Sequence, residues 1–117
     1  FGFEKIHLVN VILYNYNLIM EMISFEWDEK KSKTNLQEHK VTFEEAQTVF
    51  FDTNARMIFD STHSADEDRF ILLGLSAAMR VLVVVHCCRG NNEQRIRIIS
   101  ARKATKKEHK QYESFLP

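Results

Sequence analysis

Residues Arg80 to Ala104 read RVLVVVHCCRGNNEQRIRIISARKA, and this stretch decides the fold. Its first part, Val81–Val85, is an unbroken aliphatic run of the kind that a buried central strand tolerates. The residues at Gly90–Asn92 accept positive φ, so the chain can reverse there and return antiparallel as Gln94–Ser100. The stretch therefore predicts a β-hairpin.

The returning strand of this hairpin carries charge on alternate residues. Arg95 and Arg97 alternate with Ile96 and Ile98, and side chains two residues apart share one face of a strand. The isoleucines are therefore expected to pack into a core. The two guanidinium groups on the other face are expected to be available to an anion.

Shorter elements are predicted on both sides of the hairpin. They are an edge strand at Ile23–Trp27, a helix from Glu29 to Glu38 capped by Asp28, a helix after the capping box Thr42-x-x-Glu45, strands at Ala55–Asp60 and Arg69–Leu75, and a C-terminal helix after a second capping box, Thr105-x-x-Glu108. Together they predict an α+β fold. Its small antiparallel sheet has two N-terminal helices packed on it and a C-terminal helix.

The composition predicts one domain with an uneven charge distribution. A chain of 117 residues that is 44% hydrophobic can bury one ordinary core. Its formal charge is zero, but acidic residues gather in 44–68 and basic residues in 89–112. The C-terminal third is therefore the candidate surface for a polyanion.

Residues 1–21 are predicted to be an apolar extension outside a single domain formed by residues 22–117. Asn10, Asn15 and Asn17 interrupt the extension too often for a membrane span, so no membrane partner is expected. The alternative is that it adds a strand or helix that covers an apolar patch. Cys87 and Cys88 are strand neighbours whose side chains should point apart, which predicts free thiols and a cytoplasmic protein.

The residue types needed for metal-free cleavage of RNA are present. No pair of histidines or cysteines has the spacing of metal ligands, so neither a metal nor another cofactor is predicted. RNA cleavage needs a base for the 2′-hydroxyl, cations for the phosphorane and an acid for the 5′-oxygen. His63, Glu67, Arg69 and, from a neighbouring strand, Arg97 supply these groups. The alternative is a surface ion pair beside a solvated arginine face.

Other polar side chains allow more than one interpretation. His39 ends a predicted helix, where histidine commonly interacts only with the helix dipole. Lys106 lies on a helix face that is either solvated or follows a nucleic-acid backbone. Tyr112 could pack, stack on a base or donate a proton, and the sequence leaves these uses open.

Several ordered motifs between residues 25 and 112 resemble the BrnT toxins of bacterial type II toxin-antitoxin systems. They are FEWD at 25–28, NLxxH at 35–39, VTFEEA at 41–46, DxxHSxxExRF at 60–70, VVVH at 83–86 and RIISARxATxxExxxY at 97–112. The family usually has Gly where this chain has Lys40 and Pro where it has Ser61. Lys40 is expected to change only a helix terminus.

The resemblance implies a RelE-like ribonuclease fold and an endoribonuclease that inhibits translation. It implies RNA as the substrate and a BrnA-like antitoxin as the partner. This antitoxin is a ribbon-helix-helix protein, and the toxin would contact DNA only through it. The catalytic candidates are His39, His63, Glu67, Arg69, Arg97 and Tyr112; the candidates for RNA binding are Arg95, Arg102, Lys103 and Lys106. Two alternatives stay open, an inactive homologue that serves as an antitoxin-binding scaffold and a nucleic-acid-binding domain without catalysis.

Overall fold

The computed structural model describes residues 4–5, 23–62, 64, 67–90 and 95–117. His63, the turn residues Asn91 and Asn92, and most of the N-terminal extension lie outside these residues. No helix in the described part of the chain is long and apolar enough to cross a membrane.

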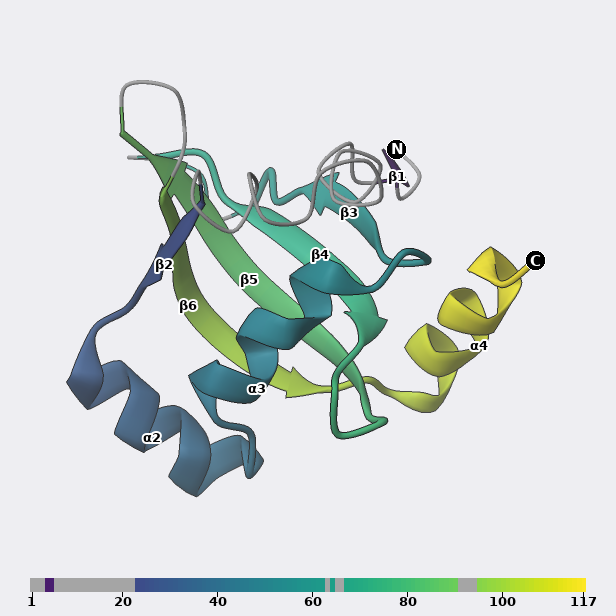
Figure 1. Ribbon diagram of the computed structural model, residues 1–117, viewed down its shortest axis with the longest axis horizontal. Helices are drawn as coiled ribbons and strands as arrows, with labels where there is room; N and C mark the ends of the chain where they lie inside the picture. The colour runs from purple at the N-terminus through teal and green to yellow at the C-terminus, as the bar shows by residue number, and fades with distance from the viewer. Residues whose placement is uncertain (1–3, 6–22, 63, 65–66, 91–94) are drawn as a thin grey trace.

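The described residues form one mixed sheet with helices on both of its faces (Figure 1). The elements are β1 (Glu4–Lys5), β2 (Ser24–Glu26), α2 (Glu29–His39), α3 (Phe43–Thr48), the 3-10 helix η1 (Val49–Phe51), β3 (Arg56–Phe59), β4 (Phe70–Leu75), β5 (Val81–Arg89), β6 (Arg95–Lys103) and α4 (Lys106–Phe115). The strand order is β1-β3-β4-β5-β6-β2.

The α+β class is confirmed, but the expectation of a purely antiparallel sheet is wrong. Strand β2 pairs parallel with β6, with Phe25 opposite Ile96, whereas the other strand pairs are antiparallel. A parallel neighbour is reached by a long connection instead of a tight turn, and the helices and the three other main strands separate β2 from β6. No local turn signal could have given its direction.

The predicted hairpin is β5 and β6, and it contains an irregularity that alternation did not predict. Val85 pairs with Ser100 but His86 pairs with Ile98, so Ile99 is an extra residue in β6. A bulge of this kind changes which face the following residues occupy. As a result Arg97, before the bulge, and Arg102, after it, lie on the same face of the sheet.

One face of the sheet is covered by α3 and η1 and holds the main core. Phe43, Val49 and Phe50 pack there against the strand residues Leu82 and Ile98, all of them buried. Figure 1 shows α3 crossing in front of the strands. Helix α2, by contrast, is mostly exposed, as its scarcity of apolar residues predicts.

Asn35 attaches α2 to the edge of the sheet. Its buried amide donates to the carbonyl oxygens of Val41 and Ala101 at 2.9 and 2.8 Å, and its Oδ1 accepts from the Ala101 N–H at 3.0 Å. Since β2 pairs with β6 only as far as Arg97, Ala101 has no strand neighbour on this side. The side chain of Asn35 therefore replaces a missing strand.

Among the described residues, α4 alone covers the opposite face of the sheet, and it does so at one end; this face is called the open face below. Tyr112 of α4 is buried there against Leu73, Val81 and Val83. In Figure 1 α4 lies at the right-hand end of the sheet, away from the β5–β6 hairpin end. Toward the hairpin end, no described helix covers the open face.

The helix termini follow the sequence signals with one difference. Asp28 caps α2, and Thr105 and Glu108 form the predicted capping box of α4. Thr42 caps α3, but the Glu45 side chain instead binds Arg80 and Ser76. Lys40 ends α2 with φ 59, a conformation that favours glycine.

His86 gives the fold a pH dependence. Its ring is 1% exposed and lies between Phe50 and Phe70, with ring centroids 4.7 and 6.0 Å away. Burial lowers the pKa of His86 from 6.5 to about 4, and this difference corresponds to about 3 kcal/mol. Because the folded pKa is the lower one, this stability is fully present above pH 6.5 and is lost as the pH falls toward 4.

The matched measurement is the free energy of unfolding by urea at several pH values for the wild type and His86→Leu. The wild type is expected to lose about 3 kcal/mol more than the variant between pH 7 and pH 4. Parallel curves for the two proteins would contradict a neutral, buried His86.

Candidate functional site

Four arginines gather on the open face at the hairpin end of the sheet. Arg97 pairs in register with Cys87, and Arg95 pairs with Arg89. Phe70 pairs with His86, so continuing that register by one residue brings Arg69 opposite Cys87. Neighbouring strands are about 5 Å apart, so Arg69 and Arg97 flank Cys87 in one row across three strands. These four residues, Arg69, Arg89, Arg95 and Arg97, are called the arginine cluster.

Two carboxylates hold the arginine cluster in place. Glu26 of β2 accepts from Arg97 at 2.8 Å and forms an ion pair with Arg95 at 3.3 Å. Glu67 accepts from Arg89 at 3.0 Å. The parallel pairing of β2 brings Glu26 directly opposite Arg97. Among the described residues, the cluster contains four arginines and two bound carboxylates, which leaves an excess of positive charge.

Arg69 differs from the other members of the cluster. Its Nε is buried and has no hydrogen-bond partner among the described residues. Its backbone is fixed on both sides, since its N–H donates to Ser64 Oγ at 3.0 Å and its carbonyl accepts from Asp60 N at 2.8 Å. The described protein groups therefore leave one buried donor of the Arg69 guanidinium unsatisfied.

The neighbours of Glu67 set its protonation. Burial of the carboxyl acts to raise the pKa of Glu67, but the hydrogen bond and charge of Arg89 outweigh burial and lower it. Cys87 lies beneath this pair and is 1% exposed. Burial, followed by the charge of Glu67, raises the pKa of the Cys87 thiol. At neutral pH Glu67 is thus a carboxylate and Cys87 a neutral thiol.

The structure brings only part of the predicted catalytic set together. Glu67, Arg69 and Arg97 share the hairpin end of the open face, whereas His63 lies outside the described residues. His39 lies at the end of α2, 3.9 Å from the Glu38 carboxylate. It lines a cavity of about 270 Å³ at the β6 edge, together with Lys30, Lys31 and Ser100 among others.

Tyr112 lies at the α4 end of the open face and has an internal partner. Its hydroxyl donates to Asp52 Oδ2 at 2.8 Å, and the same oxygen accepts from Leu75 N at 2.8 Å. Burial and the bond to Asp52 raise the pKa of Tyr112. These contacts join α4 to the turn before β3 and give the residue a packing role.

The predicted RNA-binding residues are also divided. Arg102 forms a two-pronged pair with Glu108 at 2.7 and 2.9 Å, which lowers the pKa of Glu108 to about 2. Lys103 pairs in register with Leu82, on the helix-covered face, and Lys106 is exposed on the first turn of α4. Only Arg95 of this set belongs to the arginine cluster.

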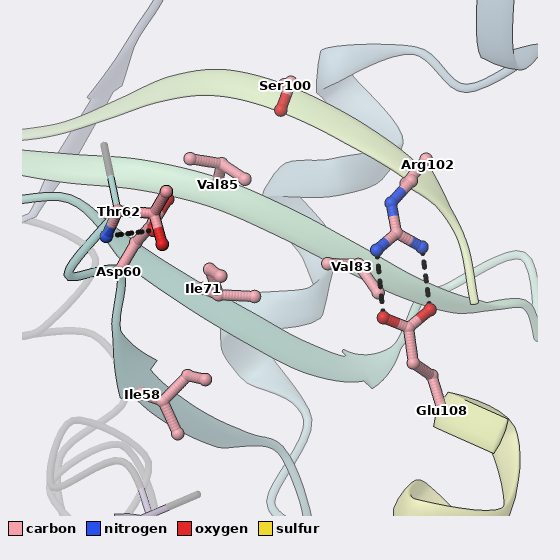
Figure 2. Close-up of a pocket in the computed structure, with 9 residues that line it drawn as sticks. All are labelled: Ile58, Asp60, Thr62, Ile71, Val83, Val85, Ser100, Arg102 and Glu108. Atoms are coloured by element: carbon pink, nitrogen blue, oxygen red, sulfur yellow. Dashed lines mark hydrogen bonds and ion pairs between the residues drawn. The ribbon is translucent and has the colours of Figure 1, made fainter. Parts of the chain in front are cut away.

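A pocket of about 380 Å³ lies on the open face between the arginine cluster and α4. Figure 2 shows the residues that line it. Its floor consists of aliphatic residues from three strands: Ile58, Ile71, Val83 and Val85. Its polar residues are Asp60 and Thr62 at one end, Ser100 along one side, and Arg102 with Glu108 at the other end.

Sequence reasoning did not identify this pocket or Glu26. The pocket depends on the bulge in β6, and Glu26 depends on the unexpected parallel pairing. The FEWD motif was the only sequence signal that included Glu26. As for metal ions, no group of three or more histidine, cysteine, aspartate or glutamate side chains with suitable geometry occurs within the described ranges.

Comparison with known proteins connects this geometry to a family. Residues 27–108 match the family model described as the ribonuclease toxin, BrnT, of type II toxin-antitoxin systems. The chain belongs to the BrnT toxin family. The matched segment includes Glu67, the arginine cluster and the pocket residues, and ends at Glu108. The family is thus one of ribonuclease toxins of type II toxin-antitoxin systems.

A solved structure with the BrnT fold agrees with this assignment. The crystal structure of the Brucella abortus ribonuclease toxin, BrnT, superposes with a TM-score of 0.56 at 20% sequence identity. The match covers 72% of this chain and 99% of the Brucella chain. At this identity the likeness concerns the fold. No curated protein sequence matches the chain.

Proposed function

We propose that this BrnT-family chain is an endoribonuclease that cleaves RNA by metal-independent acid-base chemistry at the arginine cluster and thereby inhibits translation. The observation that supports this most is the row formed by Arg69, Cys87 and Arg97, in which the register places one arginine on each side of β5. Planar guanidinium groups match the geometry of a phosphate. A phosphate of the RNA backbone would lie between them.

The cluster provides the charge that the reaction requires. Attack of the 2′-oxygen on phosphorus forms a P–O bond and adds negative charge to the non-bridging oxygens before the bond to the 5′-oxygen breaks. Arg97 is oriented by Glu26, and Arg69 retains its buried donor. Fixed cations of this kind stabilise the transition state without reorganising during the reaction.

Proton transfer requires a base and an acid on opposite sides of that phosphate. Glu67 is ionised at neutral pH and can accept the proton of the 2′-hydroxyl, although its lowered pKa limits its basicity. His63, four residues earlier, is the proposed acid for the 5′-oxygen. His39 is assigned to RNA contact at the β6 edge, and Tyr112 to packing.

The biological partners are proposed from the family membership. A BrnA-like antitoxin with a ribbon-helix-helix domain is the proposed partner, and contact with DNA would occur only through it. The acidic segment 44–68 has the sign of charge that a basic antitoxin segment requires, with Glu45 and Glu67 in it already paired with arginines of the protein. The toxin domain is proposed to comprise residues 22–117 and to act in the cytoplasm, where its RNA substrate is translated.

The metal-independence is tested with the purified full-length chain and a structured RNA in the presence of excess EDTA. The cleavage rate is expected to be unchanged by EDTA and by later addition of Mg²⁺, because arginines supply the positive charge. Loss of cleavage in EDTA and its return with a divalent cation would contradict the mechanism.

One observation favours a second candidate function, an inactive antitoxin-binding scaffold. Arg89, Arg95 and Arg97 each already bind a carboxylate of the protein, which partly neutralises the cluster. A scaffold predicts antitoxin binding without growth arrest when the chain is expressed alone. An active toxin predicts arrest that co-expression of the antitoxin prevents.

A further inference from the structure

The pocket on the open face lies one row of side chains from the arginine cluster. Along β5, Val85 in the pocket floor is followed on the same face by Cys87, and Cys87 pairs with Arg97. Along β6, Ser100 of the pocket pairs with Val85. Two residues of a strand span about 7 Å. This separation suits a ring and a phosphate joined through one sugar.

The lining of the pocket suits a flat ring with a polar edge. Ile71, Val83 and Val85 form an aliphatic floor, and Ser100 provides a hydroxyl beside it. Asp60 and Thr62 lie at the end of the pocket away from α4 (Figure 2). A mostly apolar cavity of this size with few polar groups is typical of a small-molecule subsite.

The charge pattern argues against a second phosphate in the pocket itself. Arg102, the pocket's cation, is held by Glu108 through two hydrogen bonds. Asp60 places a carboxylate at the opposite end. A phosphate is therefore favoured at the arginine cluster, and a neutral ring is favoured in the pocket.

We propose that this pocket is a base-binding subsite that holds one unpaired nucleobase next to the scissile phosphate. This inference rests on the proposed ribonuclease function and adds a source of sequence preference to it. The ring lies on the aliphatic floor, and its edge meets Asp60 and Ser100. Asp60 Oδ1 already accepts from Thr62 N at 3.2 Å, and a carboxylate with about four lone-pair positions can accept a further hydrogen bond. Asp60 therefore favours a base with an exocyclic amino group over uracil, whose edge has one N–H between two carbonyl oxygens.

The first test measures binding of nucleoside monophosphates and is independent of cleavage. Cytidine and uridine 3′-monophosphates are titrated into the full-length wild type, Asp60→Asn and Val85→Phe, with chemical shifts of the pocket methyl groups followed by NMR. The wild type is expected to bind the cytidine nucleotide about tenfold more tightly. Asp60→Asn is expected to remove this preference, and Val85→Phe, which fills the pocket, to weaken both nucleotides at least tenfold.

The second test measures the base preference at the cut site during cleavage of an RNA library with random sequence. The wild type is expected to disfavour uracil at one position beside the cut, and Val85→Phe to lose that preference. Val85→Thr, which keeps the shape of the side chain, is the matched control and should retain it. Equal unfolding midpoints for the variants show that the fold is intact, and Ser100→Ala provides a second, smaller change if Asp60→Asn does not fold.

The outcomes separate the two proposals. RNA cleavage with no base preference, or with one that Val85→Phe leaves unchanged, would overturn the base subsite and leave the ribonuclease intact. Binding of nucleotides in the pocket without any cleavage would support the subsite and overturn the ribonuclease. Nucleotide binding that leaves the pocket methyl shifts unchanged would overturn the subsite whether or not RNA is cut.

Discussion

Replacing Arg97 with alanine is expected to lower the rate of RNA cleavage by about 10²–10³-fold, a loss typical of removing one group that stabilises transition-state charge. Arg97 is 26% exposed, is oriented by Glu26 at 2.8 Å and lies in the row that carries the proposed phosphate. Without Arg97, the phosphate loses a positive charge on one side. Arg69 lies on the other side of Cys87 and cannot replace that charge from its own position. The measurement is the single-turnover rate with a short RNA at saturating enzyme.

Arg95→Ala is the matched control for Arg97→Ala. Arg95 binds the same carboxylate of Glu26 but is 54% exposed and forms a longer contact, at 3.3 Å. Its removal is expected to lower the rate only severalfold, mainly through weaker binding. Arg97→Lys should remain well below the wild type because an ammonium group lacks the fork of donors. Equal rates for Arg95→Ala and Arg97→Ala would refute the special position of Arg97.

The largest expected effect on stability comes from Asn35→Ala. The substitution leaves the carbonyl of Val41 and both backbone polar groups of Ala101 without their partner. Each buried polar group left unpaired costs about 1–3 kcal/mol, and partial access of water lowers the sum, so we expect a loss of about 3 kcal/mol. The measurement is the free energy of unfolding from urea titration followed by circular dichroism.

Gln37→Ala provides the control in the same helix. Gln37 is exposed, and alanine is at least as favourable there for helix formation, so the change in unfolding free energy should stay within about 0.5 kcal/mol. If Asn35→Ala lowers stability no more than Gln37→Ala does, Asn35 does not replace a strand at the edge of β6.

The parts of the fold that could be predicted are those whose signals are local. The aliphatic run and the alternating arginines predicted β5 and β6, and the capping residues predicted where α2 and α4 begin. The direction of β2 could not be predicted, because a three-residue edge strand contains no turn that fixes its partner. The bulge at Ile99 depends on pairing with β5 and has no signature in β6 alone.

The candidate site divides in the same way. Alternation predicted that Arg95 and Arg97 share a face opposite the buried isoleucines, and the structure confirms it. Glu26 was not predicted because it reaches Arg97 through tertiary pairing. The sequence could not show whether Tyr112 packs or donates a proton, because its hydrogen-bond partner Asp52 lies sixty positions earlier in the chain. Assignment of the acid and the base to His63 and Glu67 stays a prediction.

The central claim is that RNA supplies its own nucleophile at the arginine cluster, and the chemistry of the product ends tests it most directly. The purified chain is incubated with an RNA and with the same RNA carrying one 2′-deoxynucleotide at the mapped cut. We predict 2′,3′-cyclic phosphate and 5′-hydroxyl ends from the first and no cut at that position in the second. Products with 3′-hydroxyl and 5′-phosphate ends, or equal cleavage of the deoxy-substituted strand, would contradict the account.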